Sequence, residues 1–170
     1  MSLCTLRGHR VCLVILTAFL WSAAGNTPTA SPPSWFWGCW IVTKALPTTG
    51  ISGLSQEQVD TIIGTRLVFT PSCARSGRTV ASSPEYSTRV LSDREFFEFC
   101  HFALSQIGVS EKQVTEVTLV KPELPTSDFL ANYVFLRKTD IVIEAEGVYF
   151  AAKRAKPGDP ACTCKTPEAK

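Results

Sequence analysis

The strongest constraint in this sequence is a pair of apolar segments at opposite ends of its folded part. The first opens with Gly38-Cys39-Trp40 and continues as a β-forming run over 40–44. The second covers 147–154 and ends in Arg154. Short runs of β-branched and aromatic residues are typical of strands. Because a curled sheet closes when its first and last strands pair, these segments predict a sheet whose opening and closing strands lie side by side.

Residues 1–24 have the pattern of a secretory signal peptide. Arg7 and Arg10 make a basic start, residues 11–20 are mostly apolar, and the small residues at 22–24 suit a signal peptidase. The apolar core is shorter than the roughly 20 residues that a membrane-spanning helix needs. We therefore predict a secreted or periplasmic protein with no membrane span after signal cleavage. An uncleaved anchor is the alternative.

The charge of the processed chain is balanced. Of 17 Lys and Arg residues, Arg7 and Arg10 leave with the signal, so 15 basic residues face 15 acidic ones. Nucleic-acid binding requires an excess of positive charge on one face. The sequence therefore predicts no nucleic-acid partner. The densest basic group, Lys153-Arg154 with Lys156, is interpreted as a solvated strand end, and an anion or lipid-headgroup site is the alternative.

Composition divides the processed chain into three parts. Residues 25–34 are rich in Pro, Thr and Ser and predict a disordered linker. Residues 35–154 hold the apolar segments and predict one globular domain, and the proline-containing segment 155–170 predicts a flexible tail. Four large rings stand within 35–40. We expect them to plug one end of the core, with a partner-binding or sugar-stacking patch as the alternative.

Two capping boxes mark the starts of two helices. Ser55 with Gln58 precedes a short helix over 56–63, and Ser92 with Glu95 precedes a longer one that we expect to extend to Ile107. The longer helix has an apolar stripe widened by rings at positions 97 and 99, so we expect burial on more than one side. Strands are expected at 40–44, 66–70, 86–91, 114–120, 130–137, 140–145 and 148–153, with 71–84 as an exposed excursion.

Several motifs together resemble a family of small exported bacterial proteins that are described as lipocalin-like. They are Gly38-Cys39-Trp40, Ile51-Ser52-Gly53-Leu54-Ser55, Ile63-Gly64, Pro84-Glu85-Tyr86 and the segment from Glu146-Gly147 to Arg154. The resemblance covers about 38–154. It implies an α+β fold: an antiparallel lipocalin-like or calycin-like β-barrel, or a strongly curved sheet, of about seven to eight strands with two helices. It also implies that Arg154 lies over Trp40 as a structural closure. The family is of largely unknown function, so the resemblance indicates a fold rather than an activity.

Cysteine usage fits an exported protein. Two cysteines lie in the signal, and the others are Cys39, Cys73, Cys100, Cys162 and Cys164. In an oxidising compartment, five cysteines form at most two disulfides. We favour a bridge from Cys73 in the excursion to Cys100 on the helix, while Cys39 could reach Cys162 or Cys164. The Cys-Thr-Cys spacing has no neighbouring histidine, so we predict no metal site.

No group of residues predicts catalysis. His101 is the only histidine of the processed chain, and it directly follows Cys100 on the expected helix. Adjacent helical positions do not face each other, so these two side chains cannot act as base and nucleophile. The carboxylate pairs 95/98 and 144/146 lack a second convergent group. We therefore predict a protein that is not an enzyme and uses no cofactor.

Two classes of function remain open. The first is a binding protein that holds a small apolar molecule in its barrel interior. The predicted lining consists of Trp40, Phe69, Tyr86, Tyr133, Phe135 and Phe150. The second is an exported protein-binding factor, such as a hydrolase inhibitor, that acts through 71–84 or the Trp-rich start. A structural role in the envelope is the remaining alternative.

Overall fold

The computed structural model describes residues 31–47, 52–120 and 133–165. In chain order, they form a 3₁₀ helix (Ser34–Phe36), β1 (Gly38–Ala45), α1 (Gln56–Ile62), β2 (Arg66–Thr70), β3 (Cys73–Ser76), β4 (Thr79–Ser82), β5 (Glu85–Ser92), α2 (Asp93–Cys100), a second 3₁₀ helix (Leu104–Ile107), β6 (Gln113–Val120), β7 (Tyr133–Leu136), β8 (Ile141–Ala145) and β9 (Val148–Arg154). The predicted signal peptide 1–24, positions 25–30 of the predicted linker and positions 130–132 of a predicted strand lie outside the described residues.

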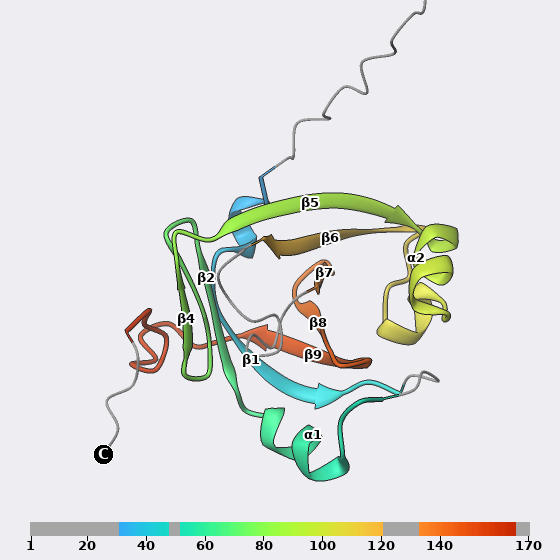
Figure 1. The fold of residues 1–170 in the computed structure, drawn as a ribbon. Helices are drawn as coiled ribbons and strands as arrows, with labels where there is room; N and C mark the ends of the chain where they lie inside the picture. Colours follow the sequence, from blue (N-terminus) through green and yellow to red (C-terminus); the bar gives the residue numbers. More distant parts are fainter. Residues whose placement is uncertain (1–30, 48–51, 121–132, 166–170) are drawn as a thin grey trace, which may run out of the picture.

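One antiparallel sheet contains the nine described strands, in the order β4-β3-β2-β1-β9-β8-β7-β6-β5. The first strand pairs with the last, and Trp40 is opposite Arg154. The sheet curls into a half-barrel, and no ladder joins β4 to β5 within the described residues (Figure 1). The predicted curved antiparallel sheet with two helices is therefore confirmed. The predicted number of seven to eight strands is wrong.

The additional strands come from residues 71–84, which form a hairpin rather than an exposed excursion. β3 pairs with β2 on one side and with β4 on the other. Gly77, at φ +57°, lies in the turn between β3 and β4. All four residues of β3 are buried, although Arg75 and Ser76 are polar. A later segment of the chain covers Arg75, and local hydrophobic alternation cannot reveal such burial.

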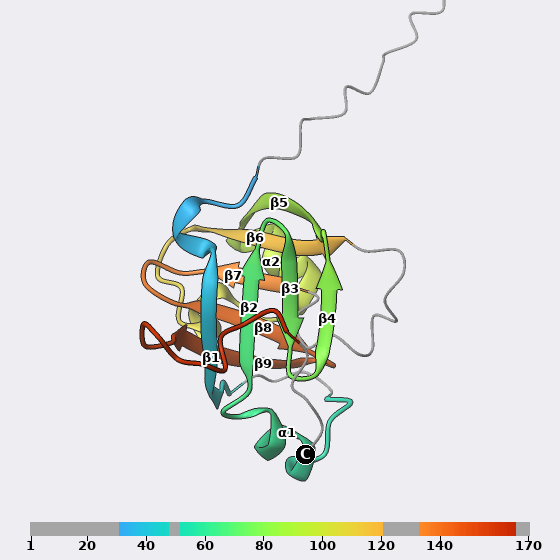
Figure 2. The same cartoon turned by 90° about the vertical axis from the view of Figure 1, so that its left-hand side faces the viewer.

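The strands divide into two halves that cross each other, β1–β4 and β5–β9 (Figure 2). The core between the halves contains the fully buried rings of Phe36, Trp40, Phe69 and Phe150. α1 adds two aliphatic side chains to it. We call this cluster the inner core.

A second core lies on the outer face of the half β5–β9, where α2 covers the sheet (Figure 2). It contains Phe96 of α2 together with Phe135, Val142 and Tyr149 of three adjacent strands. Because side chains alternate along a strand, neighbours such as Val134 belong to the inner core. Strands β7–β9 are therefore buried on both faces. We call this second cluster the outer core.

Both predicted capping boxes are present, but α2 is shorter than predicted. It ends at Cys100 rather than Ile107, because His101 takes a left-handed conformation at φ 63° and turns the chain. The residues after this turn re-enter the outer core. Phe97 and Phe99 are 53% and 47% exposed, so α2 buries one side, contrary to the expectation that several sides are buried.

Candidate ligand-binding pocket

The pairing of β1 with β9 places Arg154 against the opening segment of the domain. Its guanidinium carbon lies 3.9 Å from the ring centroid of Trp40. Its Nη1 donates to the carbonyl of Trp37 at 2.7 Å, and its Nη2 donates to that of Trp35. The buried Trp40 indole N–H donates to the carbonyl of Phe36 at 3.0 Å. These contacts join the start of the domain to its end, and we interpret their role as structural.

The six residues predicted to line a barrel cavity lie on both faces of the sheet. Four pack in or against the inner core, namely Trp40, Phe69, Tyr86 and Phe150. Tyr133 and Phe135 belong with the outer core, so the six do not share one interior. β7 is apolar on both faces, so its sequence does not indicate which residues point inward. Three of the inner rings are at most 1% exposed, so they fill the space that we expected a ligand to occupy.

A pocket of about 410 Å³ lies on the outer face of the half β5–β9, between the C-terminal end of α2 and strands β7–β9. It is lined by Phe99, Cys100, His101, Phe102, Tyr133, Glu144, Gly147 and Tyr149. Four of these eight residues are aromatic rings that come from both the helix side and the sheet side. Concave sites of a few hundred Å³ with mostly apolar walls and a few polar groups are typical of small-molecule sites.

The floor of the pocket is a row of three cross-strand neighbours. Glu144 on β8 pairs with Tyr133 on β7 and with Tyr149 on β9. Directly opposed residues share one face of a sheet, so the carboxylate stands between the two phenol rings. The ring of Phe99 lies 5.4 Å from that of Tyr133, and the ring of Phe102 lies 4.7 Å from that of Tyr149. The four rings thus form two edge-to-face pairs, one on each side of Glu144.

Glu144 is a partly buried acid that forms no ion pair with the residues described. Its Oε1 accepts a hydrogen bond from the backbone N–H of Gly147 at 2.7 Å, which fixes the orientation of the carboxylate. Within the described ranges, its Oε2 accepts no hydrogen bond. Burial raises the pKa of Glu144, and the neighbouring Glu146 raises it further. The free oxygen can therefore accept a hydrogen bond from a ligand in the pocket.

Cys100 contributes a thiol to the pocket wall. The hydroxyl of Tyr149 donates to Cys100 Sγ at 3.1 Å. Burial raises the pKa of the Cys100 thiol and also that of the Tyr149 hydroxyl. A thiol with a raised pKa stays protonated at neutral pH and is a poor nucleophile. The pair therefore forms a polar edge of the pocket rather than a reactive centre.

An ion pair between β5 and β6 lies beside the pocket. Arg89 on β5 contacts both carboxylate oxygens of Glu116 on β6, at 2.7 and 3.1 Å. Its guanidinium carbon also lies 5.3 Å from the ring centroid of Phe99. Glu116 is 1% exposed, so the carboxylate depends on this partner. Since Glu116 already balances the charge of Arg89, that charge does not offset Glu144.

The chain matches no protein-family model, no curated protein and no solved structure. Membership of the lipocalin-like family therefore stays a prediction, and the pocket has to be interpreted from its own chemistry. Within the described ranges, no helix is long and apolar enough to cross a membrane.

Two other hollows fit a ligand less well. One of about 470 Å³ lies against Val90 and residues 111–115, so a single stretch of chain forms most of its wall and no ring lines it. Another, of about 360 Å³, lies between β1, β2 and the C-terminal segment, beside Arg154 and Lys156. Neither has rings on opposing walls.

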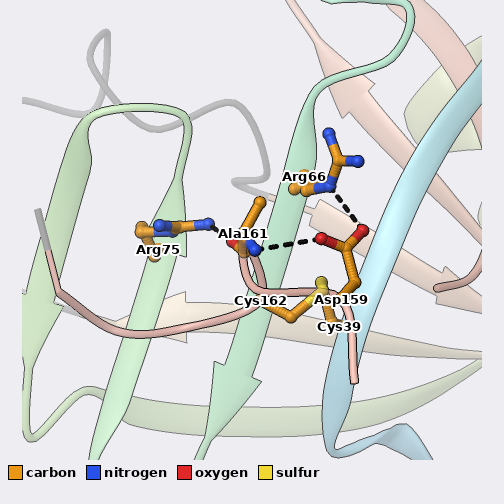
Figure 3. Close-up of polar contacts among 6 residues, drawn as sticks. All are labelled: Cys39, Arg66, Arg75, Asp159, Ala161 and Cys162. Atoms are coloured by element: carbon orange, nitrogen blue, oxygen red, sulfur yellow. Dashed lines mark hydrogen bonds and ion pairs between the residues drawn. A yellow bond between two sulfur atoms is a disulfide. The ribbon is translucent and has the colours of Figure 1, made fainter. Parts of the chain in front are cut away.

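Residues 155–165, which we expected to be a flexible tail, lie across the outer face of β1–β3 (Figures 2 and 3). Asp159 accepts a hydrogen bond from Arg66 Nε at 2.8 Å, and this contact holds the pKa of Asp159 below its ordinary value. Arg75 donates to the carbonyls of Ala161 and Lys165. This segment therefore covers the side of β3 that carries Arg75 and explains the burial of that side.

The disulfides correct the predicted pairing. Cys39 is bonded to Cys162 and Cys73 to Cys164, while Cys100 is free. The favoured bridge between Cys73 and Cys100 is wrong, because β3 and α2 lie on opposite sides of the inner core (Figure 2). Disulfides persist in oxidising compartments, so two of them fit an extracellular or periplasmic protein.

Sequence reasoning missed most of this pocket. It named Tyr133 as a ligand contact but assigned it to the barrel interior, and it treated Glu144 only as half of a carboxylate pair. The available signal was that polar or partly polar side chains, Tyr133, Glu144 and Tyr149, stand within strands that are otherwise apolar. Strand register, which brings the three together, was not available from one sequence.

Proposed function

We propose that this protein is an exported, non-enzymatic binding protein that holds one small, largely apolar molecule between α2 and strands β7–β9. The observation that carries the proposal is a hollow of about 410 Å³ with four aromatic rings on two opposing layers. That volume suits a molecule of one or two rings. The proposal places the ligand on the outer face, since rings of the protein itself occupy the inner core.

The polar groups of the pocket support binding over catalysis. Burial raises the pKa of the Cys100 thiol and keeps it protonated, which removes the most reactive candidate nucleophile. Export to a secreted or periplasmic location is supported by the signal-like start of the chain and by the two disulfides.

A protein-binding factor is the second candidate. One observation favours it: Trp35, at the start of the domain, is 39% exposed. Residues 71–84 give this function less support than expected, because they belong to the sheet and because the C-terminal segment covers β3.

Native mass spectrometry of the protein purified from its own secretion compartment, compared with the denatured protein, tests the proposal. We expect a retained small molecule of constant mass. Phe99→Ala should lose it, because this ring lines the pocket. Phe97→Ala is the matched control, since Phe97 is on the same helix, similarly exposed and outside the pocket lining. A co-purifying protein instead of a small molecule would favour the second candidate.

A further inference from the structure

We infer that the ligand of this pocket is a small organic cation, namely a protonated amine joined to an apolar body. The inference rests on the proposed function, because it specifies the ligand of the same pocket. Three properties of the pocket lead to it: the arrangement of the rings, the balance of charge, and the orientation of the one carboxylate.

The rings provide the first argument. The faces of aromatic rings carry negative electrostatic potential and attract a cation, and cages of several rings are used to recognise quaternary ammonium groups. Tyr133 and Tyr149 flank the same point on the sheet. Phe99 and Phe102 lie against them from the helix side, with ring centroids 5.4 and 4.7 Å apart. A ligand that enters between these pairs meets rings on both layers.

The balance of charge provides the second argument. No Lys or Arg is among the residues that line the pocket, whereas Glu144 is. Arg89, the cation at the side of the pocket, is matched by Glu116. The acid of the pocket therefore lacks a counter-charge in the part of the chain that the structure describes. A partly buried carboxylate without a counter-charge favours a ligand that supplies the positive charge.

The orientation of the carboxylate provides the third argument. The N–H of Gly147 occupies Oε1 and holds the group in place, and Oε2 is left as an acceptor in the pocket. A protonated amine at this oxygen would form a charge-assisted hydrogen bond. The cationic group would then lie between the phenol rings of Tyr133 and Tyr149, and the apolar body would lie against Phe99 and Phe102. Burial raises the pKa of Glu144, and a bound cation would lower it again.

Matched probes test the inference. Isothermal titration calorimetry at pH 7 would compare 2-phenylethylamine, which is a cation, with neutral 2-phenylethanol and anionic phenylacetate. We expect the amine to bind at least ~10-fold more tightly than the alcohol, as one charge-assisted hydrogen bond and contacts with the rings would give, and phenylacetate to bind most weakly. Glu144→Gln should reduce amine affinity ~10-fold and leave alcohol affinity within about twofold. This variant keeps the oxygen that accepts from Gly147, so its fold should be retained.

Glu146→Gln is the control for charge alone, because Glu146 is the exposed neighbouring acid and does not line the pocket. It should leave the amine affinity unchanged. Equal affinities of the amine and the alcohol would overturn the inference and leave the proposed function standing. Tightest binding of phenylacetate, or an equal loss in both glutamine variants, would also overturn it. Failure of all three probes to bind would count against the proposed function as well.

Discussion

Gly38 is the position at which the junction between the first and last strands, β1 and β9, can be tested most directly. Its φ is +134°, a conformation that residues with a side chain rarely adopt, and a Cβ added there would lie closer than 3.0 Å to Nη1 of Arg154. Gly38→Ala should therefore have two separate costs. The backbone conformation costs about 1–3 kcal/mol. The new methyl group also displaces the guanidinium from the Trp40 ring and from the carbonyls that it binds.

The second cost can be worked out from the contacts of Arg154. A cation over a ring contributes about 0.5–2 kcal/mol, and a hydrogen bond from a charged group contributes about 1.5–3 kcal/mol. Because Arg154 is exposed at the strand end, we take the lower part of these ranges and expect about 2–4 kcal/mol in total. Arg154→Met keeps an apolar stem over Trp40 and should lose the same amount.

A double-mutant cycle separates the two costs. Gly38→Ala in the Arg154→Met background should cost only the backbone term, so the coupling free energy should be about 2–4 kcal/mol. Urea unfolding followed by tryptophan fluorescence would measure all four proteins, and unchanged m-values would show that the unfolded states are comparable. Additive costs, within about 0.5 kcal/mol, would refute the argument that Arg154 joins the last strand to the start of the domain through its contacts beside Gly38.

Three further predictions follow from the pocket, the buried ion pair and the disulfides. Burial raises the pKa of Glu144, so the protonated carboxyl group stabilises the folded state relative to the ionised one. This contribution is complete below the unfolded pKa of about 4.3 and is lost as pH rises through the folded pKa. Glu144→Gln should therefore be more stable than the wild type at pH 7 and equally stable near pH 3; parallel curves of stability against pH would contradict this. Arg89→Met leaves the carboxylate of Glu116 buried without its partner and should lower the free energy of unfolding by about 2–4 kcal/mol; Arg89→Met/Glu116→Met should recover most of that loss, and a larger loss in the double variant would argue against the pair. Replacing Cys73 and Cys164 by Ser removes a link between residues 91 positions apart and should cost roughly 3–5 kcal/mol, whereas Cys100→Ser should leave no free thiol in the oxidised, signal-free protein by thiol titration; two remaining thiols would contradict the two bridges.

The helix starts and the pairing of the first and last strands could be predicted because their signals are local or lie at the two ends of the domain's sequence. Ser55 and Ser92 are followed at the correct spacing by the residues that complete each capping box, and both boxes are present. The end of α2 could not be predicted in this way. The apolar stripe continues past Cys100, but His101 turns left-handed, and the following residues pack in the outer core.

The candidate site was predicted less well than the fold. Its aromatic and acidic residues are separated by 50 positions, from Phe99 to Tyr149, and no local pattern joins them. The predicted lining assumed one interior, whereas strands β7–β9 have apolar residues on both faces and contribute to two cores. The assignment of Tyr133 and Phe135 to the inner core was wrong for this reason.

By itself, the sequence determined the helix starts and the curled antiparallel sheet, because these depend on short-range spacing and on hydrophobic runs. Only the tertiary structure decided which face each side chain of β7–β9 occupies, which cysteines meet, and where a pocket forms. Those outcomes depend on strand register and on distant segments that cover a surface. In particular, Glu144 stands between two tyrosines only because three strands align there, and the side of β3 that carries Arg75 is buried only because residues 155–165 cross it.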